Sequence, residues 1–440
     1  MSSEWAVQRL DQIAEINPTR KVHKGSAVPF VDMAALPQFS RDISVNDVVV
    51  REAKGAGAHF QNGDTLLARI TPCLENGKTA QVRCLDGDAI AEGSTEFIVL
   101  CGKDPADNDY IYYLCREPAF REYAIGRMEG TSGRQRVSWQ SIAAYQFAFP
   151  SPEERRETAR VLSTLDDRIT LLRETNATLE AIAQALFKSW FVDFDPVRAK
   201  MGGRTPEGMD EATAALFPDG LETSELGEVP RGWRVGQVAD LGDVVCGKPP
   251  PTSAPENYGG DVPFITIPDM HDLLAVTTTA RSLSKLGADS QPKKYLPPGA
   301  ICVSCIATPG LVVRVTTTAQ TNQQINSVIP HRKWGSSFPL FLLRRIGDAV
   351  RSGGSGGSVF HNLSKSGFEQ LPVLLTEPEL ADRFNAVIDP LVEKIVANQL
   401  QTQTLSTLRD TLLPRLISGQ LRLPEAQAAT EAALGGTLSV

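Results

Sequence analysis

The chain has 440 residues, of which 42% are apolar and 22% are charged, as in ordinary soluble globular proteins. It contains no apolar run of the ~18 residues that a membrane span needs and no basic-then-apolar leader at its N-terminus. We therefore expect a cytoplasmic protein with no membrane partner. The net charge of −8 excludes a chain that is basic throughout, so any face that binds a polyanion must be a local patch.

A first globular unit is expected at residues 1–150. Short strand-like segments alternate there with glycine and Asx turns such as Asn62-Gly63-Asp64, a pattern typical of a mixed α/β domain. Residues 126–136 are expected to form a flexible loop rich in arginine. The unit as a whole carries 16 Lys+Arg against 19 Asp+Glu, so it is not basic overall.

A long helix is expected at residues 151–192. Ser151 can cap this helix, and Pro152 suits its first turn. Apolar residues then recur in alternating steps of three and four, the heptad seam of a helix that packs against another helix. The seam positions are Leu162, Leu165, Ile169, Leu172, Asn176, Leu179, Ala183, Leu186 and Trp190.

The rest of the chain repeats this plan. Residues 193–230 are predicted to be an acidic connector with one short helix near 212–216. Residues 231–376 are predicted to be a second unit, in which 14 Lys+Arg stand against 9 Asp+Glu. The chain therefore holds one unit twice.

A second long helix is predicted at 377–417, followed by a flexible tail at 418–440. Its seam matches the first one, because Leu391 lies 226 positions after Leu165 and Leu412 lies 226 positions after Leu186. The seam positions are Phe384, Ile388, Leu391, Ile395, Asn398, Thr402, Leu405, Arg409, Leu412 and Leu416.

Each seam contains one asparagine. A buried amide is costly unless it meets a partner, and an antiparallel register that places Asn176 opposite Asn398 satisfies both amides. That register also sets Trp190 opposite Phe384, and its one unfavourable pairing is Leu165 with Arg409. The alternative is that each asparagine lies solvated at the edge of its seam.

The helices would then form an antiparallel coiled coil between two similar units, related by a pseudo-two-fold axis. The fold class is α+β. The seam from Leu162 to Trp190 would be about 42 Å long at 1.5 Å per residue, and one turn of B-DNA, the usual separation of half-sites, is about 34 Å. These dimensions suit a protein that reads split DNA sites.

The chain contains only weak matches to the motifs of catalytic, nucleotide-binding or metal sites. Gly77-Lys78-Thr79 resembles the end of a phosphate-binding loop, but position 72 is proline where that loop begins with glycine. Neither a G-x-G-x-x-G nor an Asn/Asp-Pro-Pro-aromatic motif occurs. Cys302 and Cys305 form a lone pair without a matching second pair, so we interpret them as buried thiols and predict no metal site.

The sequence resembles the specificity subunit of Type I restriction-modification systems over nearly its whole length. The resemblance is carried by LFKSWFVDFDPVRAKMGGRTPEGMD (186–210), ALFPDGLETSELGEVPRGW (215–233), LRDTLLPRLISGQL (408–421) and the duplicated unit. It implies two target-recognition domains on double-stranded DNA, each reading half of a bipartite site, and two helices that set the gap.

The resemblance also implies the partners. Two methyltransferase subunits that use S-adenosylmethionine, and endonuclease/translocase subunits that use ATP with Mg²⁺, would bind this chain. The chain itself would be non-catalytic and would hold no cofactor.

Direct readout of bases needs donors and acceptors on loops that reach the major groove. The candidates in the first unit are Arg69, Lys78, Arg127, Thr131, Ser132, Arg134, Gln135 and Arg136, and those in the second are Lys248, Arg351, Ser352, Ser355, Ser358, His361, Asn362 and Lys365. Arg351 and Lys365 are expected at phosphates. Each of these side chains could equally be an ordinary solvated surface group.

Three other functions remain open on the sequence alone. The chain could be a coiled-coil scaffold that joins proteins without reading DNA, or an enzyme with a degenerate site. It could also serve a fused methyltransferase-nuclease rather than separate subunits.

Overall fold

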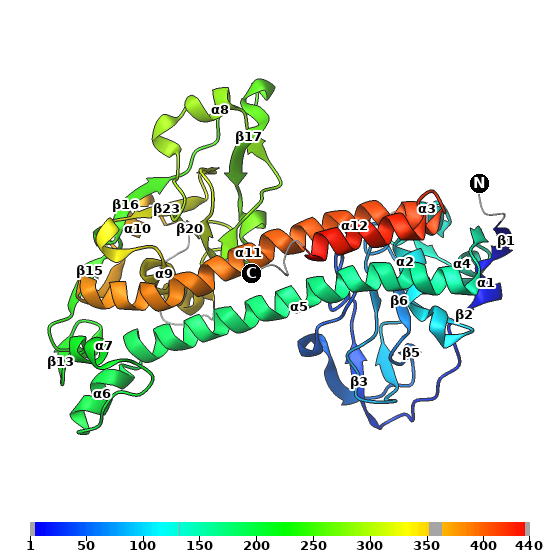
Figure 1. Cartoon of the computed structure of the whole chain (residues 1–440), viewed down its shortest axis with the longest axis horizontal. Coiled ribbons are helices and arrows are strands. Elements are labelled where there is room, and N and C mark those ends of the chain that lie inside the picture. The colour runs from blue at the N-terminus through cyan, green and yellow to red at the C-terminus, as the bar shows by residue number, and fades with distance from the viewer. Residues whose placement is uncertain (1–4, 132, 352–362, 436–440) are drawn as a thin grey trace. The chain divides into compact units, whose positions relative to one another are not determined.

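The computed structural model describes residues 5–131, 133–351 and 363–435 (Figure 1). The chain divides into two compact units. Unit 1 comprises Met1–Leu172 with Gln401–Val440, and unit 2 comprises Arg173–Leu400. Two 40-residue helices, α5 (Pro152–Phe191) and α11 (Pro378–Ile417), each contribute one half to each unit.

Unit 1 contains two four-stranded sheets. The first has the order β2-β9-β6-β7, from Ala14–Ile16, Phe97–Gly102, Thr65–Ala68 and Thr79–Gln81. The second has the order β4-β3-β8-β5, from Val49–Glu52, Ala27–Val31, Ala91–Gly93 and Ala58–Phe60. All six residues of β9 are buried, which places it in the middle of the core.

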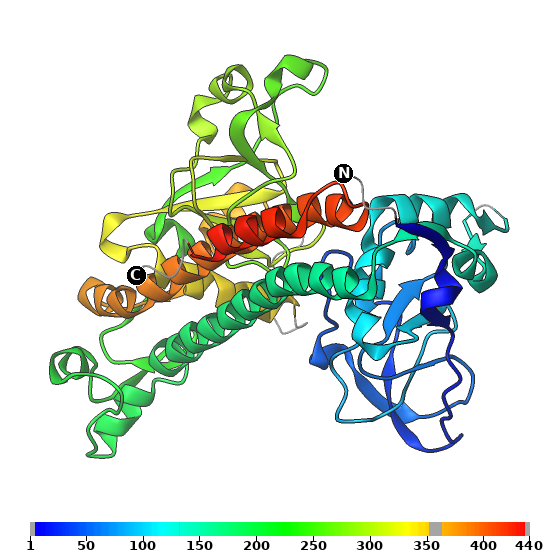
Figure 2. The same cartoon turned by 45° about the vertical axis from the view of Figure 1, so that its right-hand side comes forward.

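The remaining elements of unit 1 are two small strand pairs and several helices, and the chain can be followed by its colour in Figure 2. Two small pairs of strands are β1 (Ala6–Arg9) with β12 (Gln146–Phe149), and β10 (Met128–Glu129) with β11 (Arg136–Val137). The helices are α1 (Leu10–Ile13), α2 (Asn108–Arg116), α3 (Pro118–Gly126), α4 (Trp139–Ala143) and α12 (Leu423–Gly435), with short turns η1 (Val45–Asp47) and η2 (Pro105–Asp107).

Unit 2 repeats this topology. Its five-stranded sheet has the order β16-β23-β20-β21-β18, from Gly242–Cys246, Ile325–Pro330, Ile301–Ser304, Val312–Val315 and Ala275–Val276. Its three-stranded sheet has the order β19-β17-β22, from Ser282–Leu283, Tyr258–Ile265 and Gln320–Thr321. A parallel pair occurs at the same place in both units, as β3 with β8 and as β17 with β22. The internal duplication predicted from the sequence is confirmed.

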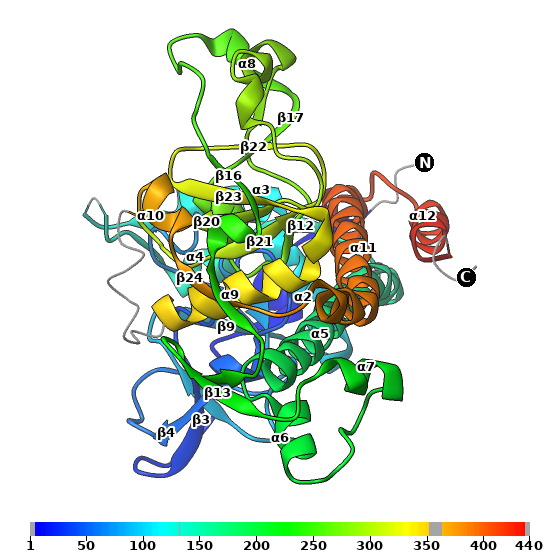
Figure 3. The same ribbon diagram turned by 90° about the vertical axis from the view of Figure 1, so that its left-hand side faces the viewer.

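Helices cover the sheets of unit 2, and α9 (Ser337–Arg351) packs on β20 and β21 (Figure 3). The other elements are α6 (Asp195–Met201), α7 (Glu211–Leu216), α8 (Lys285–Asp289), α10 (Lys365–Glu369), the hairpin of β13 (Leu221–Ser224) and β14 (Gly227–Pro230), and the pair of β15 (Arg234–Gln237) and β24 (Pro372–Leu375). Short turns are η3 (Val238–Asp240), η4 (Pro255–Asn257), η5 (Ile267–Met270), η6 (Pro292–Lys294) and η7 (Arg332–Trp334).

The helix pair forms part of the core of each unit. Helix α5 begins with a reciprocal cap, in which Glu154 N donates to Ser151 Oγ and Ser151 N donates to the carboxylate of Glu154. In unit 1 the buried seam is made of Leu162, Leu165, Ile169, Leu172, Leu405, Leu412 and Leu416. In unit 2 it is made of Ala183, Trp190, Phe384, Ile388 and Ile395, with Leu179, Leu186 and Leu391 partly buried against them.

The predicted asparagine pair is confirmed. Asn398 Nδ2 donates to Asn176 Oδ1 at 2.8 Å, and Asn176 Nδ2 donates to the carbonyl of Ile395 at 3.2 Å. Both residues belong to unit 2. The helices are therefore antiparallel in the register that the sequence predicted; Asn398 is buried, Asn176 is partly exposed, and both amides are hydrogen-bonded.

The same register sets Leu165 opposite Arg409, and a buried ion pair compensates the charge of this arginine. Arg409 is 4% exposed and its Nη1 lies 2.6 Å from Asp166, which is 2% exposed and also accepts a hydrogen bond from Tyr113. Leu165 remains buried among leucines. The seam thus tolerates a guanidinium because the neighbouring helix supplies a buried carboxylate.

Two segments are more ordered than the sequence predicted. The prediction of a flexible tail was wrong for residues 423–435, which form α12. Ala426 and Thr430 of this helix are buried, because the alanine-rich segment presents small side chains at helical spacing to the rest of unit 1. The acidic connector contains the predicted short helix as α7, and also α6 and a hairpin. Aromatic rings fix it, since Phe194 packs on Trp233 and Phe217 packs on Trp190.

None of the helices in the described part of the chain combines the length and the apolar composition that a membrane crossing requires.

Candidate nucleic-acid interface

The arginine-rich loop of unit 1 is the tip of the β10–β11 hairpin. Met128 pairs with Val137 and Glu129 pairs with Arg136, and Gly130 and Gly133 adopt φ of 128° and 82°, which allows the chain to turn. Within the turn, Arg134 N donates to the carbonyl of Thr131 at 3.0 Å. The side chains of Thr131 and Arg134 are exposed. The tip therefore presents donors to solvent, as a base-reading loop requires.

The hairpin is fixed to the end of β6. Val137 N donates to the carbonyl of Arg69 at 2.9 Å, and Thr71 N donates to the carbonyl of Gln135 at 3.0 Å. The guanidinium of Arg136 binds the carboxylate of Glu96 at 2.6 Å, and this hydrogen bond raises the pKa of Arg136. Arg136 was predicted to contact DNA, and in this structure its guanidinium joins the β10–β11 hairpin to Glu96.

Three other predicted residues of unit 1 differ in the contacts that their side chains make. Arg127 lies over the ring of Tyr123, with 5.2 Å from its guanidinium carbon to the ring centroid. Lys78 Nζ donates to the carbonyl of Met33 at 2.8 Å, so this lysine ties two loops together. Arg69 is partly buried, and no hydrogen bond or ion pair joins its side chain to any other described residue.

Unit 2 presents lysines at the end of β16. Lys248 is exposed directly after this strand, and Lys294 Nζ donates to the carbonyl of Cys246 at 2.8 Å. That hydrogen bond brings the Lys293-Lys294 turn beside Lys248. Of these three lysines, only Lys248 was predicted from the sequence, although the adjacent Lys293 and Lys294 are a local signal that could have indicated the other two.

The second predicted loop is only partly described. Arg351 is held by the carbonyl of Gly310 at 2.8 Å and by Asp348, and Lys365 lies 3.3 Å from Glu369. The other predicted contacts lie outside the described residues; they are Ser352, Ser355, Ser358, His361 and Asn362 here, and Ser132 in unit 1.

A polar loop that sequence reasoning missed follows β2 in unit 1. Asn17 adopts a left-handed conformation with φ of 52°, and its Oδ1 accepts a hydrogen bond from Val99 N at 3.0 Å. Arg20 binds Asp64 at 2.7 Å, and His59 Nδ1 donates to the carbonyl of Arg20 at 3.1 Å. These bonds hold the loop against β9 and β5.

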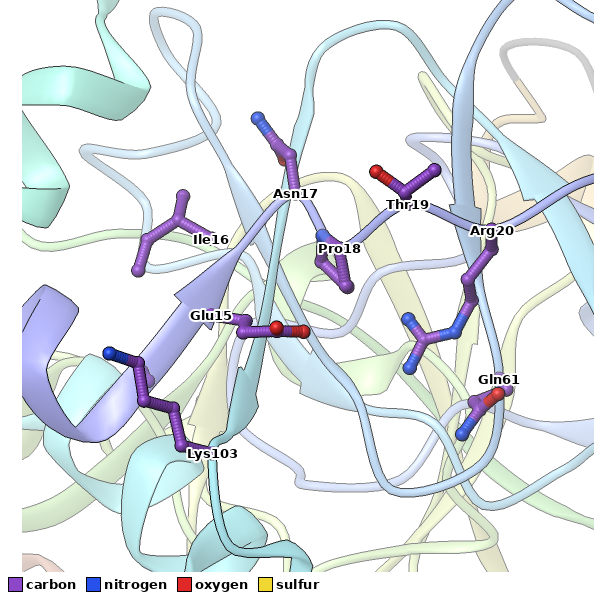
Figure 4. A pocket seen from close by; sticks show the side chains of 9 residues that line it. Glu15, Ile16, Asn17, Pro18, Thr19, Arg20, Gln61 and Lys103 are labelled. Carbon is purple, nitrogen blue, oxygen red and sulfur yellow. The ribbon is translucent and has the colours of Figure 1, made fainter.

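Hollows lie on both sides of this loop. One is about 630 Å³ and is lined by side chains of both charges, including Glu15, Arg20 and Lys103 (Figure 4). The other is about 350 Å³, and Arg20, His59 and Arg69 line it without any carboxylate. The second hollow thus reaches from the β2–β3 loop to the residue that supports the β10–β11 hairpin.

Two buried carboxylates lie behind these hollows. Burial raises the pKa of Asp64 to about 6, against the lowering effects of Gln61 N and Arg20. Glu92 is fully buried; burial alone would raise its pKa, but hydrogen bonds from Lys54 N and Arg51 hold it below its ordinary value. Asp64 therefore holds Arg20, and Glu92 holds Arg51, from the interior of the unit.

Comparison with known proteins identifies the family. Residues 2–181 and 230–383 match the model of the Type I restriction modification DNA specificity domain, once in each half of the chain. The chain belongs to this family. It is a DNA sequence-specificity subunit of the Type I restriction-modification class, as the resemblance implied.

Relatives within the family agree along most of the chain. The HindI specificity subunit of Haemophilus influenzae is 36% identical over 409 residues, which cover 82% of this chain and 87% of that subunit. The MjaIX specificity subunit of Methanocaldococcus jannaschii is 27% identical and covers 96% and 94%. The crystal structure of a Type I S subunit from M. genitalium has a TM-score of 0.56 at 13% identity, covering 94% and 96%, so the fold is shared.

Proposed function

We propose that unit 1 and unit 2 each read one half of a bipartite site on double-stranded DNA. The observation that carries this proposal is the duplicated topology, in which the order β2-β9-β6-β7 of unit 1 recurs as β16-β23-β20-β21 in unit 2 and each unit has one parallel strand pair at the same place. Two similar readers on one chain suit two half-sites. In this proposal the β10–β11 hairpin reads bases in unit 1, and Lys248 with the Lys293-Lys294 turn contacts DNA in unit 2.

The helices set the gap between the half-sites in this proposal. Each of α5 and α11 begins in one unit and ends in the other, and the Asn176–Asn398 pair fixes their register. Insertion of one heptad in both helices should change the tolerated gap and leave both half-sites unchanged. Sequencing of methylated adenines in DNA from cells with each variant measures this directly. A change in the recognised bases would contradict the spacer role.

The chain is proposed to guide chemistry that its partners perform. Two methyltransferase subunits would dock on the helices and methylate adenine N6 with S-adenosylmethionine, and endonuclease/translocase subunits would use ATP with Mg²⁺. The support is the family itself and the lack of methyltransferase motifs in the sequence. We place the complex in the cytoplasm, where the host DNA lies.

The decisive experiment is methylome sequencing of the host with and without this chain. A bipartite motif that loses methylation when the chain is deleted supports the proposal. A scaffold that only joins proteins is not favoured by the family match, and it would show no DNA binding with a steep dependence on salt. Methylation by the isolated chain would instead reveal an enzyme, and the identity of the co-purifying subunit distinguishes a fused methyltransferase-nuclease.

A further inference from the structure

The smaller hollow beside the β2–β3 loop of unit 1 contains one cationic group, Arg69, that no other described residue neutralises. Arg69 has no polar partner among the described residues, and its Nε is buried. A partly buried guanidinium without a partner is costly, and such a group is stabilised when an anion binds. The absence of a carboxylate from the lining means that the hollow itself favours an anion.

The hollow is also held in place by other contacts. Asp64 binds Arg20 from the protein interior, and His59 fixes the backbone of the same residue. Because a carbonyl only accepts, His59 carries a proton on Nδ1. The charge of Arg20 is paired with Asp64, and its Nη1 makes no hydrogen bond to the described residues, so Arg69 supplies the unpaired positive charge at the hollow. Thr19 adds a hydroxyl for which no partner is found in the described part of the chain.

The position of the hollow indicates the source of the anion. Arg69 supports the β10–β11 hairpin through its carbonyl, so its side chain lies next to the element that is proposed to read bases. Contacts to phosphate fix the register of a protein on the duplex, whereas contacts to base edges read the sequence. We propose that this hollow binds one phosphate of the DNA backbone, through Arg69 with help from Thr19, and thereby sets the register of the hairpin. This inference rests on the proposed function.

The test compares full-length chains that differ at Arg69. Arg69→Met removes the charge and keeps the length, Arg69→Lys keeps the charge, and Arg160→Met removes the same charge from an exposed turn of α5. Affinity for a duplex that carries the recognised site is measured at several salt concentrations. Loss of one phosphate contact should lower the slope of log K against log salt by about 0.9. We expect this loss in R69M, little change in R69K and no change in R160M.

A second measurement locates the phosphate. Single phosphates of the duplex are replaced in turn by uncharged methylphosphonates. Wild type should lose affinity at one position where R69M shows no further loss. If R69M fails to fold, Thr19→Val provides the same comparison with a smaller expected effect. An unchanged slope and an unchanged methylphosphonate profile in R69M would overturn the inference.

Two more outcomes separate the possible failures. If inorganic phosphate raises the melting temperature of wild type but not of R69M, while both bind DNA with equal slopes, the hollow takes free phosphate and the DNA role is wrong. If wild type shows no salt-dependent binding of DNA, the proposed function itself fails, and the inference fails with it.

Discussion

Asn398 donates a hydrogen bond of 2.8 Å to Asn176, beside the leucine, isoleucine, alanine and aromatic residues that form the seam in unit 2. The side-chain nitrogen of Asn176, in turn, donates to the backbone carbonyl of Ile395 on the partner helix. One polar layer of this kind specifies a register, because a shift of either helix would leave the buried amide of Asn398 without its partner.

Replacement of one asparagine should therefore cost more than replacement of both. Asn398→Leu leaves the Oδ1 of Asn176 without its donor and should lower the free energy of unfolding by about 1–3 kcal/mol. The double variant N176L/N398L should recover most of that loss. Urea unfolding of the two single variants and the double variant gives the coupling energy. Additive losses would show that the two amides act independently.

Loss of one partner of the buried pair Asp166–Arg409 should lower the free energy of unfolding by more than loss of one asparagine. Arg409→Met leaves a buried carboxylate without its cation and should cost about 3–5 kcal/mol. D166N/R409M removes both charges, and the amide oxygen that replaces the carboxylate would still accept from Tyr113, so this variant should be closer to wild type. Thermal and urea unfolding test the expected order of stability, in which wild type is the most stable, D166N/R409M is next and R409M is the least stable. A double variant less stable than R409M would contradict it.

The two arginines of the β10–β11 hairpin should have different effects. Arg134→Ala should weaken binding at the half-site of unit 1 by about 1–3 kcal/mol if a bidentate contact to guanine is lost. Arg136→Ala should act by releasing Glu96, so Glu96→Gln should reproduce its effect. Gel-shift titrations with specific and scrambled duplexes measure both. If E96Q binds like wild type while R136A does not, then Arg136 touches DNA itself.

The stability of unit 1 should fall as the pH rises from about 4 to about 6. Asp64 has its pKa raised to about 6 by burial, above the ordinary value of about 3.9. The folded state then binds more protons than the unfolded state between these values. The contribution is complete below about pH 4 and is lost as the pH rises through about 6. Its size is on the order of 1–3 kcal/mol.

Asp64→Asn provides the control for this dependence, since its amide cannot titrate. Unfolding by urea at about pH 4.5 and at about pH 7.5, on either side of the raised pKa, is compared in the two proteins. Wild type should lose more stability than D64N between these conditions. An equal change in both proteins would assign the pH dependence to other groups.

The sequence predicted the helix pair well because its signals are local. The heptad steps and the cap at Ser151 each lie within a single helix, and the structure begins α5 at Pro152. The pairing partner of Arg409 was missed, because Asp166 is next to a seam position and not on it. The C-terminal tail was predicted to be flexible from its composition alone, and composition does not show that Ala426 and Thr430 would be buried.

The polar face of unit 1 could not be predicted in this way. Arg20, His59 and Arg69 come from three separate segments, and strand pairing brings them to one hollow. The bond between Arg136 and Glu96 joins residues 40 positions apart. Such neighbours depend on the register of β-strands, which one sequence does not specify at a distance.

Unit 1 is closed by residues from the other end of the chain, since Leu405, Leu412 and Ala426 complete the core around Leu162 and Leu165. During translation the ribosome releases residues 5–172 first, yet the segment that covers their leucines emerges last. Residues 173–400 can therefore form their core earlier. The lobe that is made first is thus the last to finish folding, and a message cut short before codon 401 would leave that lobe open and dependent on chaperones.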